Sequence, residues 1–440
     1  MKKLIAAILA IVMCLSLVAC GGPSGEQSQK PNQSSSQEGG ETIKIGVLYP
    51  LSGSTATAGN SALWAVEWIT DYINNELGGI QSMDGAKIEL VVGDSKGDSQ
   101  VGLTEFERMV NVENVSVMFG FYNTAVTNTL SQYCIANQVP AIATNAVGDE
   151  AFSQPNDYVF HANGCNATNT LFSNQRTEWM REVIKPMKKF AYVYDSAGYG
   201  RESYETALAN MEENGYEEIV GIPIEAGSAD FSSQILQLKN DPEIEWVQPS
   251  MNMSDAILFV RQMKEYDVAL PIFGNGGGFL QADFIEQAGD AADYVFSTSM
   301  WFPSMWETAW DTDFAKTVMD DYYEEFGYDF DESASCAWLG FWCVWDALER
   351  AGSADRETIA QAMAETDISG EHYATLLSGS KTVKFEDGEG AAGVMVYNQN
   401  FDTPVPWACI RDGEYRVVWP EELASQEYEF TWPIPSWDER

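Results

Sequence analysis

Two kinds of apolar pattern alternate along this chain: short continuous runs, and residues repeated every three or four positions. In the first part, short runs of β-branched and aromatic residues predict buried strands. These runs occupy residues 43–49, 88–92, 115–119 and 139–143. Between them apolar residues recur every three or four positions, as at Ala62, Val66, Ile69 and Ile73, which is typical of an amphipathic helix. No hairpin turn separates the runs, so the pattern predicts a parallel sheet covered by helices.

The same rhythm starts again after residues 161–164. Further strands are predicted at residues 190–194, 219–224, 245–247, 271–273 and 294–297. Helices are predicted at residues 201–214, 231–238, 255–266, 313–326 and 334–351, and β-rich runs follow at 382–385, 394–397, 407–410 and 415–418. Two α/β lobes of one design favour a hinge with a cleft between them. Ligands of such sheets bind beyond the carboxyl ends of the strands.

The length of the chain supports the division into two lobes, because 440 residues exceed what one hydrophobic core usually serves. We expect residues 42–163 with 298–383 to form the first lobe. We expect residues 164–297 with 384–440 to form the second lobe.

The first forty residues differ from the rest. Two lysines precede an apolar stretch over residues 4–19 that ends in Leu17-Val18-Ala19-Cys20, and residues 21–40 are rich in Gly, Ser, Gln and Pro. An apolar stretch this short is typical of a cleaved signal peptide rather than a membrane span. Leu-Val-Ala-Cys resembles the lipobox of bacterial lipoproteins. That resemblance implies a signal peptide over residues 1–19, a lipid on Cys20 and attachment to the outer face of a cell membrane; the alternative, which we favour less, is an ordinary cleaved signal peptide with Cys20 incidental. The composition of residues 20–41 predicts a flexible linker.

The charge is strongly acidic, with 66 Asp and Glu against 24 Lys and Arg and a net charge of −42. This argues strongly against nucleic acid and an anionic lipid surface as partners, because both would be repelled. Two explanations remain: the solubility of an exposed surface, which we favour, and a cationic ligand.

The sequence gives little support for an enzyme. The two histidines, His161 and His372, lie in unrelated contexts, and no nucleophile elbow or metal-ligand spacing accompanies them. The glycine-rich run at residues 274–278 lacks the third glycine of a dinucleotide loop, because Phe279 occupies that place. Cys336 and Cys343 would lie two helical turns, about 10 Å, apart, too far for a disulfide. We therefore expect neither an enzyme nor a cofactor nor a metal site.

Four stretches resemble a known family in order and spacing. They are residues 43–53 with Ala58-Gly59, residues 93–95, residues 193–200, and residues 227–238. Together they resemble the periplasmic-type solute-binding proteins of branched-chain amino acid (leucine, isoleucine, valine) ABC importers. The resemblance covers about residues 42–400 and implies two Rossmann-like lobes joined by three crossovers, the type I periplasmic binding protein fold. It also implies a monomer that closes over a small solute and delivers it to ABC permease subunits.

The resemblance carries ligand-binding positions to this sequence. Asn123, Thr124 and Ala125 correspond to the loop that holds the ligand carboxylate, although helix capping explains Asn123 and Thr124 equally well. Asn145 and Val147 fall on the exit of the next strand, where Val147 replaces the family's threonine. Tyr199 falls on a tyrosine that lines the cleft from the second lobe.

Two positions depart from the family. Asn252 stands where amino-acid binders often carry tyrosine, and Gly276 stands where they often carry the glutamate that pairs with the ligand ammonium. A buried ammonium without a carboxylate partner is costly, so either another acid serves, with Asp255 as a weak candidate, or the ligand belongs to another class.

Several descriptions of the ligand and of the role therefore stay open. Aromatic residues after the last strand of the second lobe, Trp301 above all, favour a larger apolar or aromatic ligand. The chain is expected to bind an amino acid or a related small polar solute. The alternatives are an amide, urea-like or aromatic acid solute, or an extracellular ligand sensor.

Overall fold

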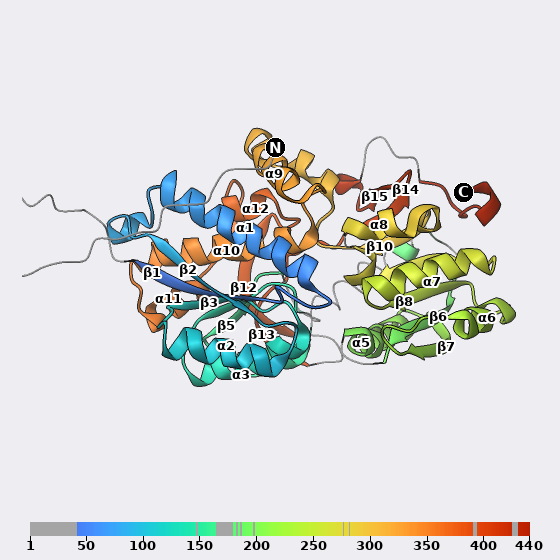
Figure 1. Ribbon diagram of the computed structural model, residues 1–440, viewed down its shortest axis with the longest axis horizontal. Helices are drawn as coiled ribbons and strands as arrows, with labels where there is room; N and C mark the ends of the chain where they lie inside the picture. Colours follow the sequence, from blue (N-terminus) through green and yellow to red (C-terminus); the bar gives the residue numbers. More distant parts are fainter. Residues whose placement is uncertain are drawn as a thin grey trace, which may run out of the picture. The chain divides into compact units, whose positions relative to one another are not determined.

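The fold was analysed in a computed structural model (Figure 1). It describes residues 42–146, 148–163, 179–181, 184, 187–196, 199–275, 277–280, 282–389, 394–424 and 430–440. The predicted signal peptide, Cys20 and the predicted linker lie outside these residues and stay predictions.

The first lobe is built on an eight-stranded sheet. From edge to edge its strands are β11 (Asp367–Ser369), β12 (Thr382–Glu389), β13 (Met395–Asn400), β5 (Val159–His161), β4 (Ala141–Ala143), β3 (Val117–Gly120), β1 (Ile43–Tyr49) and β2 (Ile88–Asp94). The pairs from β13 to β2 are parallel, and β12 runs antiparallel to both of its neighbours. The predicted parallel sheet is therefore confirmed, with an antiparallel edge added to it.

Helices cover both faces of this sheet. Successive side chains of a strand point to opposite sides, so each strand contributes to the core on both faces. Ile45 and Val47 of β1 pack with α1 (Ala56–Asn75) and α10 (Glu332–Ala351), while Leu48 packs with α2 (Ser99–Asn111) and α3 (Thr124–Ala136). The core on the α1 side also receives α9 (Thr312–Phe326), α11 (Arg356–Ala364) and α12 (Tyr373–Leu376). The apolar spacing of residues 62–73 is thus explained by burial of one face of α1.

The second lobe is built on a seven-stranded sheet. Its strands are, in order, β15 (Glu414–Trp419), β14 (Trp407–Arg411), β10 (Val295–Thr298), β9 (Ile272–Asn275), β8 (Trp246–Ser250), β6 (Lys189–Asp195) and β7 (Glu217–Ile224). The five strands from β10 to β7 are parallel, and β14 and β15 add an antiparallel edge. One face packs with α6 (Ser232–Asn240), α7 (Met253–Glu265) and α8 (Ala282–Ala288), and the other with α5 (Tyr199–Glu213).

The chain passes between the two sheets three times: after β5, after β10 and after β13. The predicted boundary between residues 383 and 384 is wrong for the third passage, because β12 and β13 both pair within the first sheet. The β-rich runs of this region look alike in sequence, and nothing local tells which sheet edge each run joins. The pattern also missed β5, β11, α8 and α11, which are all short.

Aspartates fix where several helices begin. The side chains of Asp98, Asp311, Asp331 and Asp355 accept hydrogen bonds from backbone N–H groups in the first turns of α2, α9, α10 and α11. Gly327 and Gly352, with φ of 75° and 55°, end α9 and α10 in the left-handed conformation that glycine adopts without strain.

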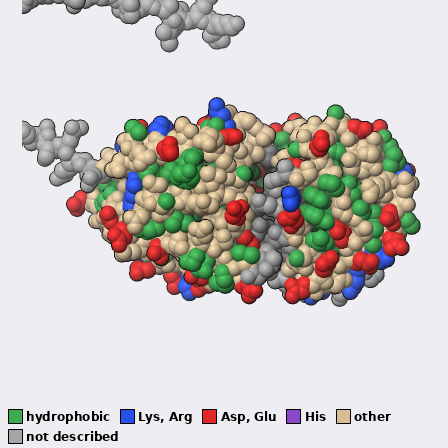
Figure 2. All heavy atoms as spheres, turned by 90° about the horizontal axis from the view of Figure 1, so that it is seen from below, with side chains coloured by type: hydrophobic (Ala, Val, Ile, Leu, Met, Phe, Trp, Pro, Cys, Tyr) green, Lys and Arg blue, Asp and Glu red, His purple; other side chains and the backbone are tan. Residues whose placement is uncertain are grey.

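Carboxylates are spread over the face in Figure 2, where Lys and Arg are fewer. A helix long and apolar enough to cross a membrane does not occur within the described part of the chain.

Candidate functional site

The loop between β3 and α3 contains the first group of predicted ligand-binding residues. Asn123 is the N-cap residue of α3, but its side chain makes no capping hydrogen bond. Its Nδ2 lies 3.4 Å from Thr55 Oγ1, and its Oδ1 is buried without a hydrogen-bond partner among the described residues. Thr124 and Ala125 form the first turn of α3, whose N–H groups offer donors to an anion. The capping explanation for the Asn123 side chain is therefore wrong.

Asn145 follows β4, the neighbour of β3 in the sheet. Thr144 Oγ1 donates to Asn145 Oδ1 at 2.8 Å and is also hydrogen bonded to the hydroxyl of Tyr49 at 3.2 Å. The side chain of Asn145 also contacts the thiol of Cys336 in α10. The Asn145 amide is thus fixed by its neighbours, next to the loop that carries Asn123.

Two residues of the second predicted group follow the carboxyl ends of neighbouring strands in the other sheet. Tyr199 begins α5 after β6, and Asn252 is the exposed N-cap residue of α7 after β8. Val147, Gly276 and the side chain of Tyr199 lie outside what the structure describes. Asp255, the candidate replacement for the missing glutamate, is 2% exposed and accepts hydrogen bonds from the Gly227 N–H at 3.0 and 3.1 Å.

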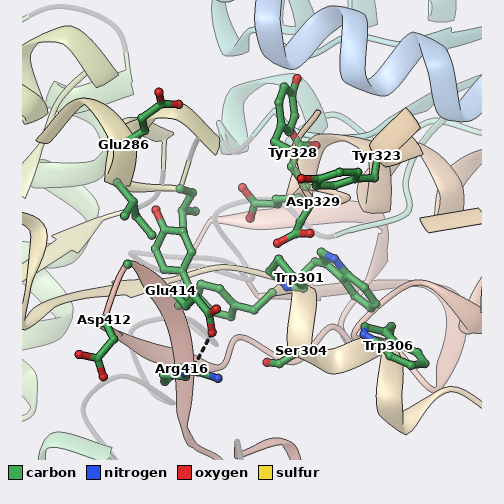
Figure 3. A pocket seen from close by; sticks show the side chains of 18 of the residues that line it. Glu286, Trp301, Ser304, Trp306, Tyr323, Tyr328, Asp329, Asp412, Glu414 and Arg416 are labelled. Atoms are coloured by element: carbon green, nitrogen blue, oxygen red, sulfur yellow. Dashed lines mark ion pairs between the residues drawn. The ribbon is translucent and has the colours of Figure 1, made fainter. Parts of the chain in front are cut away.

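A cavity of about 840 Å³ is lined by residues of both lobes (Figure 3). Its aromatic lining residues are Trp301, Phe302, Trp306, Tyr323, Tyr328 and Tyr415. Trp301, Ser304 and Trp306 come from the passage after β10, while Asp412, Glu414 and Arg416 come from the β14–β15 hairpin. Of the residues predicted to bind ligand, Trp301 lines this cavity, and Asn123, Asn145 and Asn252 do not.

Two of the aromatic walls meet across the lobes. The rings of Phe302 and Tyr415 lie 5.4 Å apart, and the Tyr415 hydroxyl donates to the Phe279 carbonyl at 2.5 Å. Trp301 is 2% exposed and donates from its indole N–H to the Phe330 carbonyl at 3.0 Å. These contacts fix the rings of the cavity wall.

The start of α10 supplies two carboxylates to the cavity, Asp331 and Glu332. Asp331 accepts hydrogen bonds from the Ala334 N–H at 2.9 Å and from the Ser61 hydroxyl, which in turn accepts from the Tyr322 hydroxyl at 2.8 Å. Glu332 accepts from the Met300 N–H at 3.2 Å. Burial raises the pKa of Asp331 to about 6 and that of Glu332 to about 7.

The same two carboxylates connect the cavity to the predicted ligand loop. Tyr122 precedes Asn123, and burial together with the charges of Glu332 and Asp331 raises the pKa of its hydroxyl. The charge of Glu332 also adds to the raised pKa of Tyr415. Glu332 therefore lies near both the β3–α3 loop of the first lobe and the hairpin of the second.

The charged residues that line the cavity are mainly acidic. Its acidic residues are Glu286, Asp290, Asp293, Asp329, Asp331, Glu332, Asp412 and Glu414. Arg416 is the basic residue among the described lining residues, and it pairs with Glu414 (Figure 3). The cavity thus offers negative charge and aromatic faces. A group of side chains able to hold a metal ion does not occur within the described residues.

Two α/β lobes with three passages between them, and a cavity lined from both, define a type I periplasmic binding protein. Residues 42–402 match the sequence family described as periplasmic binding protein, and the chain belongs to that family. The resemblance drawn from the sequence is thereby confirmed, as is the expectation of a binding protein rather than an enzyme.

Relatives and solved structures agree with this assignment. A Leu/Ile/Val-binding protein homolog 7 from Brucella abortus (strain 2308) is 25% identical over 407 residues, covering 88% of this chain and 93% of the relative. The branched-chain amino acid binding protein LivJ of Streptococcus pneumoniae, solved with isoleucine, has a TM-score of 0.68 and 21% identity over 86% of this chain and 100% of its own. The solute-binding protein of an ABC transporter from R. palustris, solved with benzoate, has a TM-score of 0.67 and 16% identity over 88% of this chain and 99% of its own.

Proposed function

We propose that this protein captures a small polar solute, an amino acid or a related compound, by closing its two lobes, and delivers the solute to an ABC permease. The lipid on Cys20 would hold it at the extracytoplasmic face of the membrane. The observation that carries the proposal is the cavity lined from both lobes beside the passage after β10. A solute bound there would contact both lobes, so its binding energy would favour the closed arrangement.

Apart from Trp301, the predicted residues lie outside the described lining of this cavity, and we propose that they contact the solute once the lobes have closed. The α3 N-terminus, with Asn123, Thr124 and Ala125, would receive a carboxylate or another acceptor group. Asn145 and Val147 from the first lobe, and Tyr199, Asn252 and Gly276 from the second, would line the cleft where strands of both sheets end. Trp301 would form an apolar wall.

A thermal-shift screen of the purified protein tests the proposal. The panel contains branched-chain, aromatic and basic amino acids, short amides, urea and aromatic acids. A solute at a hundred times its dissociation constant should add about 2.7 kcal/mol of stability. X-ray scattering with and without the stabilising solute should then show a smaller radius of gyration when it is bound. An unchanged radius would contradict closure.

The screen also decides between the alternatives. A shift only with amides, urea or aromatic acids would favour those solutes. Uptake of the labelled solute by cells that lack the protein distinguishes transport from sensing: loss of uptake supports delivery to an importer, while unchanged uptake favours the sensor.

A further inference from the structure

We propose that the start of α10, residues 332–336, connects all three passages between the lobes to the loops predicted to bind the solute. Within this arrangement Asn163 is a positioning residue, which holds one passage against the helix. The inference rests on the proposed function, because it concerns how the two lobes close.

The passage after β5 is held to α10 by Asn163. This side chain is buried, and its Nδ2 donates to the Cys336 carbonyl at 3.0 Å and to the Thr144 carbonyl at 3.2 Å. Both protons of the amide are therefore used on groups of the first lobe. Cys336 belongs to α10, and Thr144 immediately precedes Asn145. The described beginning of this passage is thus fixed between the helix and the exit of β4.

The other two passages meet on the same part of α10. The backbone N–H of Met300, in the passage after β10, donates to the Glu332 carboxylate at 3.2 Å. The side chain of Met300 also packs with Cys336 and with Val405, which comes from the passage after β13. These three buried side chains form a small cluster of their own, apart from the large cores of the lobes.

The passages are also tied to one another. Asn400 Nδ2, at the end of β13, donates to the Ala162 carbonyl at 2.8 Å, which joins the third passage to the first. Gly379 lies between the second passage and the third: a Cβ there would be 2.5 Å from the Met300 carbonyl oxygen and 3.0 Å from the ring of Pro404. Because each passage contacts another, the three must bend together.

The same turn of α10 contacts the predicted solute-binding loops. The side chain of Asn145 contacts the Cys336 thiol, and the hydroxyl of Tyr122, next to Asn123, is hydrogen bonded to Ser333. Two regions are coupled when both contact one packed element that can shift. A solute that moves either loop would therefore act on the turn that holds all three passages.

Distances between the lobes of the solute-free protein test this inference. Spin labels, attached by chemistry that does not use cysteine, replace Glu107 in α2 and Leu236 in α6, which are exposed positions on different lobes. Asn163→Ala removes both hydrogen bonds of the amide. We expect electron paramagnetic resonance to show a distribution of distances about twofold wider than in the wild type, because hinge motion is confined to a few residues.

Asn74→Ala is the matched control. Asn74 also makes two side-chain hydrogen bonds to backbone, with Ile88 at 2.8 and 2.9 Å, but these join α1 to the edge strand β2. We expect both variants to lose stability in urea and only Asn163→Ala to widen the distribution. A merely structural role of Asn163 would lower stability and leave the distribution as narrow as in Asn74→Ala, which would overturn the inference.

Gly379→Ala decides the question if Asn163→Ala does not fold. The added methyl group should push the second and third passages apart and shift the mean distance between the labels. An unchanged mean would overturn the inference and leave the proposed function standing. By contrast, a wild-type distance that no solute of the thermal-shift panel shortens would contradict closure, and with it the proposed function.

Discussion

The backbone N–H of Met300 donates to the carboxylate of Glu332 at 3.2 Å. Met300 lies in the passage that leaves β10 for the first lobe, and Glu332 begins α10 and lines the cavity. The segment between the lobes is therefore hydrogen bonded to a carboxylate that lines the cavity.

The buried carboxylates predict how stability depends on pH. The pKa of Glu332 is raised from 4.5 to about 7 and that of Asp331 from 3.8 to about 6. Between pH 4.5 and 7 the folded protein thus holds protons that the unfolded chain has released, so its stability falls as pH rises. We expect the ligand-free protein to melt a few degrees higher at pH 5 than at pH 7.5.

The groups around Glu332 do not reverse that trend. Asp331 shifts in the same direction, and Tyr122, Cys336 and Tyr415 have raised pKa values and stay neutral in this range. Glu332→Gln should reduce the difference in melting temperature between pH 5 and pH 7.5. If the difference in melting temperature were not reduced, carboxylates other than Glu332 would be its cause.

The hydroxyl of Ser61 links two buried partners. It donates to Asp331 and accepts from Tyr322, which is 0% exposed. Ser61→Ala would leave both groups short of a hydrogen bond, so we expect a loss of about 1–3 kcal/mol in the free energy of unfolding. Urea denaturation measures it, with Ser54→Ala on the exposed loop as the control. Equal stability of the two variants would show that the network contributes nothing.

Gly59 is required where α1 approaches the loop after β1. A Cβ at this position would lie 2.1 Å from the Pro50 carbonyl oxygen. Gly59→Ala must therefore push α1 and the loop apart, at a cost of about 1–3 kcal/mol in the free energy of unfolding. Thr57→Ala, on the same turn and partly exposed, should stay within about 0.5 kcal/mol of the wild type. A stable Gly59→Ala protein in urea denaturation would mean that the loop moves freely.

The lipid anchor is tested by Cys20→Ser. Without the thiol no thioether to lipid can form, so the protein should move from the membrane fraction to the medium or to the soluble extracytoplasmic fraction. Immunoblotting of the fractions measures the change. Cys343→Ser, at a buried position in α10, is the control for a general effect of losing a cysteine. Membrane retention of Cys20→Ser would reject the anchor.

The sequence predicted most of the strands and long helices, because their buried apolar residues form either a continuous run, as in β1, or a repeat of three and four positions, as in α1. It missed β5 and β11, which have three residues each, since so short a run shows no period. It also misplaced the third passage, because the pairing of β13 with β5 joins residues far apart in sequence.

Some residues of the candidate site could be predicted from the sequence, and others could not. Asn123 and Asn145 were predicted from the family resemblance, and the structure places them after adjacent strands of one sheet; their part in binding stays a prediction. Glu332 was missed because Asp331-Glu332 before an apolar stretch has the pattern of a helix start, and Asp331 does cap α10. Its proximity to Tyr415 comes from the folding of two lobes together, which no local pattern contains.

The place of β13 has a consequence for how the protein is made. This strand lies between β5 and β12, so the first sheet cannot be completed until residue 400 has been synthesised. By then β6 to β10 of the second lobe have already left the ribosome. The amino-terminal lobe therefore cannot finish folding as an early domain during synthesis, and a chain in transit remains without its complete core. Such a chain is suited to being threaded through a translocation channel before it folds on the far side.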